Sequence, residues 1–359
     1  MLERRSRFIE QLLDDERLDA LLIFGRCDMR YLCGFTGTDG VLLLSRSGAD
    51  FFTDSRYQEQ ARQEVRADRI HCYKNKLEAV GEQLVAAGFQ RIGFDARDLT
   101  VAQYDLLKRA PTLCHLDWNP LADQLATLRS IKDADELDLL RQAASLNRQA
   151  FETVLPHIRA GVSEREIALE LEFTLKKLGG GANAFDFIVA SGPRGALPHG
   201  VASAKKIMAG ELVTIDFGTC RGGYYSDETV TLAVGEVDGK LRQIFDIVLE
   251  AHDCAMAAVR PGLRACDLDA VARDLITAQG YGDFFGHGLG HGVGLQVHEY
   301  PALTTRNLDE LLPGMVITIE PGIYLPGIGG VRIEDTIVVT AAGYECLTSI
   351  PKQLRVLAS

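Results

Sequence analysis

The sequence lacks several features that would assign it to a familiar class at once. Its 359 residues contain no apolar run that approaches the ~20 residues needed by a membrane-spanning helix. The start, MLERRSRFIEQLL, has no apolar stretch of the kind that a signal peptide requires. The eight cysteines form no C-x-x-C pair, which argues against a structural zinc ribbon. We therefore expect a cytoplasmic protein with reduced thiols and no membrane partner.

Positive charge is also scarce. Lys and Arg together number 38 against 50 Asp and Glu, which gives a net charge of -12. A protein that binds nucleic acid needs a basic face, so this balance argues against nucleic acid as a main partner. Hydrophobic residues make up 47% of the chain and charged residues 25%, as is ordinary for a globular protein. The chain is longer than one core usually supports, so two domains are expected.

The first part of the chain alternates between strand and helix patterns, which is typical of an α/β layer domain. Strands are expected over 20–24, 41–44, 50–53 and 92–95, and helices over 58–65 and 101–109. Asp133 is the expected N-cap of a long helix that runs to about residue 155. We place the domain boundary just before the stretch LRSIKDADEL, which gives domains 1–127 and 128–359.

The second domain contains a weak internal repeat. RAGVSEREI at 159–167 matches RPGLRACDL at 260–268, and GELVTIDFG at 210–218 matches GMVITIEPG at 314–322. The two pairs are separated by nearly equal distances, so chance explains them poorly. We infer two copies of a helix–helix–β unit, and a site between the copies would draw carboxylates from both.

Each copy places two acids where strands are expected. In the first copy a hairpin can bring Asp216 close to Asp227, and in the second a hairpin can bring Glu320 close to Glu334. Acids are unfavourable in strands and costly to bury. A single strand acid fits a solvated face, and Asp335 beside Glu334 illustrates this because only one of the two can face inward. Four acids around one cavity would repel one another without cations, so the duplicated placement favours a metal site.

The stretch FGHGLGHGVGLQVHE at 285–299 carries glycine at every second position for most of its length. It lacks the G-x-G-x-x-G spacing of a dinucleotide loop, and no glutamate follows His287 as the helical zinc motif H-E-x-x-H requires. In an extended segment alternate residues share a side, so we expect His287 and His291 on one side and His298 on the other. Four carboxylates and one imidazole are suitable ligands for two divalent ions such as Mn²⁺.

In combination, these motifs resemble those of the proline-specific metallopeptidases of the pita-bread fold, Xaa-Pro aminopeptidase and Xaa-Pro dipeptidase. The resemblance covers nearly the whole chain, with a creatinase-type N-terminal domain followed by the catalytic domain. It implies an α/β (α+β) fold whose catalytic domain is duplicated about a pseudo-twofold axis. The motifs that carry it are SGP at 191–193, LPHG at 197–200, DFG at 216–218, SDxT at 226–229, GxGHGxG at 288–294, VHE at 297–299, EPG at 320–322 and RxED at 332–335.

The resemblance also implies the metal ligands and the catalytic groups. Two divalent ions are expected, most naturally Mn²⁺ with Co²⁺ or Zn²⁺ as alternatives. The implied ligands are Asp216, Asp227, His291, Glu320 and Glu334. Glu320 would also carry a proton towards the leaving nitrogen. His199 and His298 would contact the substrate and stabilise the oxyanion that develops during attack.

Other positions are implied less directly. Tyr324 matches a tyrosine that lines the pocket and contacts substrate, although an ordinary core residue fits it equally. Arg332 would act in the site by pairing with a carboxylate, unless it lies on a solvated strand face. His287 matches no motif position, so we expect a packed or solvated histidine. Val230 stands where relatives commonly carry arginine, which puts a contact behind the ligands in doubt.

The implied substrate is a peptide with a free N-terminus and proline at its second position, and a homodimer is expected. An X-Pro bond has no N–H, so a pocket shaped for the ring can select it. Two alternatives stay open: a metal-dependent hydrolase or lyase of small molecules on the same fold, and a non-catalytic binding module. The binding module is disfavoured because such proteins have usually lost ligands, whereas all five are present here.

Overall fold

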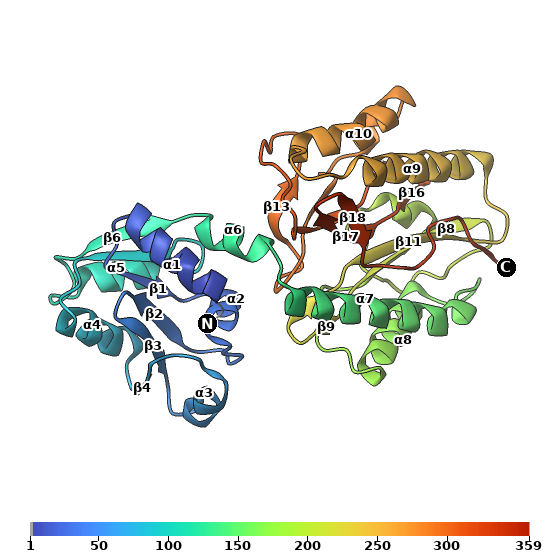
Figure 1. Ribbon diagram of the computed structural model, residues 1–359. Coiled ribbons are helices and arrows are strands. Elements are labelled where there is room, and N and C mark those ends of the chain that lie inside the picture. The colour runs from blue at the N-terminus through green and yellow to red at the C-terminus, as the bar shows by residue number, and fades with distance from the viewer. Residues whose placement is uncertain (1–2, 359) are drawn as a thin grey trace. The chain divides into compact units, whose positions relative to one another are not determined.

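The structure is a computed structural model that describes residues 3–358. The other three residues, Met1, Leu2 and Ser359, lie outside the described residues. The first expected domain begins at Met1, and the second ends at Ser359. The chain divides into two compact units, an N-terminal unit that ends at Arg129 and a C-terminal unit that starts at Ser130 (Figure 1). Within residues 3–358 we find no helix with the length and apolar character that a membrane crossing demands.

The N-terminal unit is built around one mixed sheet with the strand order β4-β3-β2-β1-β5-β6. Strands β1, β2 and β3 form an antiparallel meander, and the remaining pairs are parallel. The strands are β1 (Ala20–Ile23), β2 (Val41–Ser45), β3 (Gly48–Thr53), β4 (Arg69–Cys72), β5 (Arg91–Asp95) and β6 (Asp117–Leu121). The helices are α1 (Glu3–Asp15), α2 (Arg26–Cys33), α3 (Gln58–Glu64), α4 (Lys76–Ala86), α5 (Val101–Arg109) and α6 (Gln124–Ser130).

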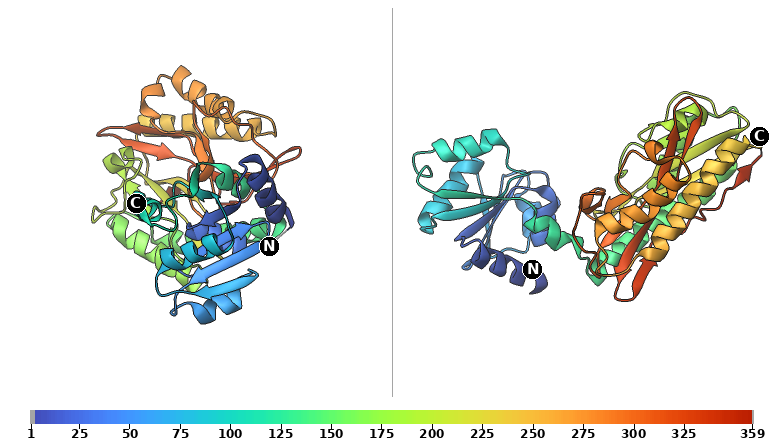
Figure 2. Two further views of the ribbon diagram at one scale, coloured as in Figure 1. Left: turned by 90° about the vertical axis from the view of Figure 1, so that its left-hand side faces the viewer. Right: turned by 90° about the horizontal axis from the view of Figure 1, so that it is seen from above.

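Helices cover both faces of this sheet (Figure 2). On one face, Leu22 and Leu43 pack with Leu84 of α4 and Leu107 of α5 in a buried cluster. The elements expected over 20–24, 41–44, 50–53, 58–65, 92–95 and 101–109 are confirmed to within two residues at each end. The helices α2 and α4 were not expected from the sequence.

The C-terminal unit consists of two similar halves, which confirms the duplication expected from the repeat. The first half has the helices α7 (Ala134–Val154) and α8 (Glu164–Lys177) and a sheet with the order β19-β11-β8-β7. The second has α9 (Gly239–Ala258) and α10 (Ala265–Ala278) and a sheet with the order β13-β12-β14-β17-β18. In Figure 1, α7 and α8 lie along one side of the strands, and α9 and α10 lie along the other.

The remaining bounds of the C-terminal unit are as follows. The strands of the first sheet are β7 (Ile188–Ser191), β8 (Glu211–Phe217), β11 (Glu228–Val234) and β19 (Val356–Leu357). Those of the second are β12 (Gly290–Gly292), β13 (Glu299–Leu303), β14 (Val316–Ile319), β17 (Asp335–Thr340) and β18 (Gly343–Cys346). Two small hairpins are formed by β9 (Cys220–Arg221) with β10 (Tyr224–Tyr225) and by β15 (Gly322–Leu325) with β16 (Gly329–Arg332). Short 3₁₀ turns cover Leu155–His157, Gly192–Ala196 and Gly282–Phe284.

Each helix pair buries its own sheet. Phe151 of α7 and Leu171 of α8 pack with Phe217 of β8 in one cluster. In the other cluster, Val248 of α9 packs with Ile317 of β14. Burial of side chains of this size contributes ~1.5–3 kcal/mol each, so two apolar layers stabilise the strands that lie between them.

Helix α7 begins as the sequence predicted. The Asp133 side chain accepts a hydrogen bond from the Glu136 backbone N–H at 3.0 Å, and Glu136 Oε2 accepts one from the Asp133 N–H at 2.8 Å. This reciprocal pair is a capping box, which satisfies two N–H groups that the first turn leaves without partners. The helix ends at Val154, close to the expected residue 155.

The glycine-rich stretch passes between two neighbouring strands. Strand β12 pairs with β13 on one side and β14 on the other. A Cβ atom on Gly290 would lie 2.1 Å from the Thr318 carbonyl oxygen, and one on Gly292 would lie 2.3 Å from that of Tyr300. Glycine is therefore required here by the close approach of backbone on both sides.

Substitution of Gly290 by alanine is expected to destabilise the C-terminal unit. The added methyl group meets rigid backbone, so we expect a loss of ~1–3 kcal/mol in the free energy of unfolding, typical of overpacking. Urea unfolding followed by circular dichroism measures it. Gly286→Ala is the matched control, because a Cβ there has no neighbour within 4 Å. Equal stability of the two variants would contradict the explanation.

Candidate metal centre

Two hairpins bring four carboxylates to one cavity. Asp216 lies near the end of β8, and Asp227 directly precedes β11, its antiparallel partner. Glu320 directly follows β14, and Glu334 directly precedes β17, again an antiparallel pair. Asp216, Asp227 and Glu334 are buried, and the Glu320 side chain is 17% exposed. The convergence expected from the duplicated hairpins is thus found in the structure.

The two halves meet directly at these residues. The Glu334 backbone N–H donates to the Thr229 carbonyl oxygen at 3.2 Å. The Thr229 hydroxyl in turn donates to Glu334 Oε2 at 2.7 Å, and the Thr336 hydroxyl donates to the Asp227 carbonyl oxygen at 2.7 Å. The start of β11 in the first half is therefore joined to the start of β17 in the second by hydrogen bonds at Glu334 and at Thr336.

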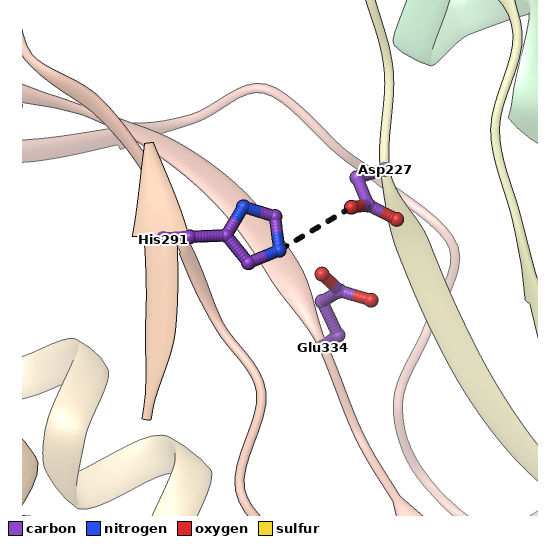
Figure 3. A group of neighbouring side chains, drawn as sticks. All are labelled: Asp227, His291 and Glu334. Atoms are coloured by element: carbon purple, nitrogen blue, oxygen red, sulfur yellow. Dashed lines mark ion pairs between the residues drawn. The ribbon is translucent and has the colours of Figure 1, made fainter. Parts of the chain in front are cut away.

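His291 faces the acids from β12 (Figure 3). Asp227, His291 and Glu334 offer ligand atoms that all lie within 4.8 Å of one another. His291 Nε2 is 3.7 Å from Asp227 Oδ2 and 3.3 Å from Glu320 Oε1. Carboxylate oxygens and an imidazole nitrogen that converge on one point form a donor set suited to divalent ions.

The cavity in front of these groups has a volume of about 420 Å³. Its other lining residues come from both halves: Phe185, Asp186, Ile188, Pro198, His199, Val201, His287, Gly288, Gly290, His298, Thr304 and Arg332. Within residues 3–358, Arg332 is the one arginine or lysine in this lining. One permanent cation therefore faces the four converging carboxylates, and the exposed Asp186 is a fifth acid in the lining.

Burial and mutual repulsion disfavour the charged forms of two acids. Burial raises the pKa of Asp227 well above its ordinary value, and the charges of Glu334 and Asp216 raise it further. Burial likewise raises the pKa of Glu334 well above its ordinary value, with Glu320 and Asp216 adding to the effect. Acids held in this way are suited to bind a cation, because the charge of the ion offsets both the cost of burial and the repulsion between the carboxylates.

Glu320 behaves differently from its neighbours. Burial alone would raise its pKa, but the hydrogen bond and charge of His291, with smaller effects from His287 and Arg332, lower the pKa of Glu320 to about 2. The pKa of His291 is raised, because Glu320 outweighs the effect of burial. Glu320 is therefore ionised at neutral pH.

Arg332 pairs with a carboxylate, as the resemblance implied. Its Nη2 donates to Asp216 Oδ2 at 2.6 Å, and its Nε donates to the Thr229 hydroxyl at 3.2 Å. The other oxygen of this carboxylate, Asp216 Oδ1, is buried and has no hydrogen-bond partner among the described residues. A buried acceptor without a partner is costly, and a metal ion bound at that position would satisfy it.

His298 was expected on the side opposite to His287 and His291, and this expectation is wrong. All three histidines line the cavity, and the ring centroids of His291 and His298 lie 4.3 Å apart. The chain bends between Gly294 and His298 before it enters β13. The alternation of an extended strand does not continue through a bend, so it could not place His298.

Tyr324 was expected to line the pocket, but it does not belong to the described residues that do so. Its side chain is buried behind the wall. Its hydroxyl accepts a hydrogen bond from Arg332 Nη1 at 3.0 Å and lies 2.8 Å from His287 Nε2. The hydroxyl also packs over Gly322, where a Cβ would lie 2.5 Å away. Tyr324 therefore supports two lining residues, His287 and Arg332.

His287, to which the sequence assigned no role, is a packed histidine that also lines the cavity. Burial lowers its pKa. Its backbone is fixed by α10, because Arg273 Nη2 donates to the His287 carbonyl oxygen at 2.6 Å. Arg273 is itself held by the buried Asp269, which also accepts the Leu289 N–H at 3.0 Å. An ion pair on one helix thus holds the start of the glycine-rich stretch.

His199 is exposed and lines the cavity from the loop after the 3₁₀ turn Gly192–Ala196. That loop is held by Glu164, a fully buried acid at the start of α8. Glu164 accepts hydrogen bonds from the backbone N–H groups of Ser191 at 2.8 Å and Ser203 at 3.1 Å, and it pairs with Arg194. A buried acid therefore supports the histidine loop of the first half, as Asp269 does in the second.

Sequence reasoning missed the apolar part of the wall. Phe185, Ile188 and Val201 line the cavity, and no motif singled them out. Ile188 could have been found from its register, because it pairs with Asp216 across β7 and β8. Val230, which was expected to affect the site, faces the hydrophobic cluster of Phe217 instead of the cavity.

The described residues hold a second group of close acids, in the N-terminal unit: Asp28, Asp95 and Asp98. Burial raises the pKa of Asp28 to about 6. Here arginines already compensate, because Arg129 lies 2.7 Å from Asp28 and Arg97 lies 3.0 Å from Asp95. The cavity of the C-terminal unit has no such balance, which distinguishes it as a place for metal.

The duplicated fold and the donor set that it assembles are those of a metallopeptidase. Two family profiles match the chain: "Metallopeptidase family M24" over residues 138–341 and "Creatinase/Prolidase N-terminal domain" over residues 4–131. The chain belongs to metallopeptidase family M24, which confirms the resemblance.

Relatives match over almost the full length. The structure of an Xaa-Pro dipeptidase from Bacillus anthracis has 44% sequence identity and a TM-score of 0.95, with 99% of each chain covered. That of an X-Pro aminopeptidase from Thermotoga maritima has 36% identity and a TM-score of 0.90, again with 99% of each chain covered. An Xaa-Pro dipeptidase from Pyrococcus horikoshii is 37% identical over 355 residues, 99% of either sequence.

Asp227→Asn is expected to stabilise the metal-free protein at neutral pH. The raised pKa of Asp227 means that its contribution to stability is present at low pH and is lost as the pH rises through the folded-state pKa. The neutral variant does not undergo this loss, so its advantage in unfolding free energy should grow as the pH rises above the ordinary pKa of an aspartate. Urea unfolding with a chelator present measures the difference.

Excess Mn²⁺ is the control for this prediction. It should reverse the order, because the ion stabilises the native state of the wild type more than that of the variant. A variant that is less stable than the wild type at every pH, with chelator present, would contradict the prediction.

Proposed function

We propose that this protein hydrolyses the peptide bond between an N-terminal residue and a following proline at a dinuclear metal centre. The observation that carries the proposal is the imbalance of charge in the cavity. Four carboxylates converge there, and the one arginine in the described lining is already bound to Asp216. Membership of a metallopeptidase family and relatives named for X-Pro substrates support the choice of reaction.

The proposed ligands are the five residues that the motifs identify: Asp216, Asp227, His291, Glu320 and Glu334. The partnerless Asp216 Oδ1 and the raised pKa values of Asp227 and Glu334 support this assignment. When bound, divalent ions lower the pKa of water and polarise a carbonyl group. Mn²⁺ is the proposed metal, because carboxylate oxygens dominate the donor set.

Glu320 is the proposed proton carrier. With a pKa of about 2 it is ionised at neutral pH, so its carboxylate can accept a proton from the attacking water. The proton is then delivered to the proline nitrogen as the C–N bond breaks. The hydrogen bond that Thr318 donates to Glu320 Oε1 at 3.3 Å helps to orient the group.

His298 and His199 are proposed to hold the scissile carbonyl. Burial and the nearby His291 lower the pKa of His298, so its ring is neutral at pH 7 and retains one N–H. Both histidines are exposed to the cavity, where an N–H donor can stabilise the negative oxygen that forms on attack. Arg332 acts by holding Asp216 in place.

Proline selection is proposed to depend on the apolar wall. Phe185, Ile188 and Val201 form a surface beside the acids on which a pyrrolidine ring can pack. The proline nitrogen carries no hydrogen, so this part of the wall needs no acceptor for it. The free N-terminus of the substrate would meet the carboxylate side of the cavity.

A homodimer in the cytoplasm completes the proposal. All eight cysteines lie within the described residues and are free thiols, which supports a reducing compartment. The dimer follows from the family resemblance alone. Light scattering of the purified chain tests it directly.

A small peptide panel with added Mn²⁺ tests the reaction. It contains Ala-Pro, Ala-Pro extended at its C-terminus, Ala-Ala, and the extended peptide with a blocked N-terminus. We expect cleavage of the unblocked X-Pro bonds only, read by chromatography, with none after chelation or in Glu334→Ala. The ratio of dipeptide to longer peptide distinguishes dipeptidase from aminopeptidase. A protein that binds two ions but cleaves no member would instead be a hydrolase or lyase of small molecules.

His298→Ala should separate catalysis from metal binding. The variant loses an N–H donor to the transition state but no metal ligand. We expect kcat to fall ~10²–10³-fold, as for loss of one oxyanion donor, with unchanged Mn²⁺ content by atomic absorption. A variant that lost its metal, or that kept full activity, would refute the role proposed for His298.

A further inference from the structure

A buried lysine lies directly behind the metal centre. Lys352, in the C-terminal segment 347–352, has a side chain that is 5% exposed. Its Nζ is 2.7 Å from Glu228 Oε1 and 3.2 Å from Asp335 Oδ1. Glu228 is fully buried on β11, and Asp335 is buried on β17. The ammonium group therefore joins a strand of the first half to a strand of the second.

The two partners of Lys352 are the chain neighbours of two proposed metal ligands. Asp227 precedes Glu228, and Glu334 precedes Asp335. Successive side chains of an extended chain point to opposite faces. Asp227 and Glu334 line the cavity, whereas Glu228 and Asp335 do not belong to its described lining. Each strand thus presents one acid to the cavity and the next to Lys352.

The rest of the C-terminal segment is bound to the same two acids. The Ile350 N–H donates to Glu228 Oε1 at 3.1 Å, and the Thr348 hydroxyl donates to Asp335 Oδ1 at 2.6 Å. On the other side, His252 Nε2 of α9 lies 3.3 Å from Asp335 Oδ2. The segment is therefore seated across the junction of the halves and does not merely pass over it.

We propose that Lys352 is a positioning residue for the metal centre: it clasps β11 to β17 and so fixes the separation of Asp227 and Glu334. The inference rests on the ligand assignment proposed above. Ligands must be held to within about 0.5 Å for productive geometry. The hydrogen bonds between Glu334 and Thr229 and between Thr336 and Asp227 join these segments directly. The ion pairs of Lys352 add a further link through the acids on the other face.

The test measures Mn²⁺ affinity by titration calorimetry on the full chain, with folding checked by circular dichroism. Lys352→Met keeps the length and apolar character of the stem but removes the ammonium. We expect its Kd for Mn²⁺ to rise at least about tenfold, the usual scale for groups that orient metal ligands. Lys352→Arg keeps the charge and should recover most of the affinity.

Two further variants separate positioning from simple stability. Leu84→Ala weakens the core of the N-terminal unit, whose buried cluster contains no residue of this junction, so it should lower the Tm and leave the Kd unchanged. Lys352→Met alone leaves the charge of Glu228 buried without its lysine, which is destabilising. The double variant Glu228→Gln/Lys352→Met removes both charges and so avoids this cost. Positioning predicts weak Mn²⁺ binding in the double variant as well.

The outcomes distinguish the two proposals. Wild-type affinity in the double variant, or in Lys352→Met, would overturn the positioning role. If the wild-type protein bound no more Mn²⁺ than Asp227→Asn does, the metal centre itself would be overturned instead. If Lys352→Met does not fold, the double variant decides.

Discussion

Repulsion among four carboxylates in one cavity is the constraint on which the rest of the C-terminal unit depends. Asp216, Asp227 and Glu334 are buried, where water cannot screen their charges, and Arg332 compensates only part of the excess. Strands carrying such residues would separate if nothing else held them. Two hydrophobic clusters, one under each helix pair, supply the opposing force. Apolar burial thus keeps the acids together until a cation can bind them.

Successive side chains of a strand point to opposite faces, so one of two neighbouring acids can face the cavity while the other faces the opposite side. At the starts of β11 and β17, one acid faces the cavity and its neighbour faces a cation on the other side. The outward acids are compensated by Lys352, whereas the cavity acids are not. This contrast explains why the pKa values of two adjacent acids, Glu334 and Asp335, shift in opposite directions. Burial and like charges raise the pKa of Glu334. Burial also acts on Asp335, but Lys352 and His252 outweigh it and lower the pKa of Asp335 to about 2.

The acids of the site could be predicted from the sequence because the repeat gives them twice, and each hairpin is a local structure. His298 could not be placed, because the bend before β13 resets the alternation on which the expectation relied. The helix α4 was missed because Gly81 lies within it. That glycine is explained only by the folded structure, where a Cβ would lie 2.9 Å from Leu113. Contacts between segments distant in sequence decide such positions, and no local pattern records them.

Both halves support a histidine-bearing segment with a buried acid, although the two acids do not occupy matching positions of the repeat. Glu164 at the start of α8 holds the loop that carries His199, and Asp269 in α10 holds the stretch that leads to His291. Each half therefore fixes its own loop by a buried acid on its second helix. What neither half can fix alone is the distance between its ligands and those of the other half. The metal centre lies where the halves are joined, so binding of an ion and docking of the halves draw on the same free energy, and a change in either one must alter the other.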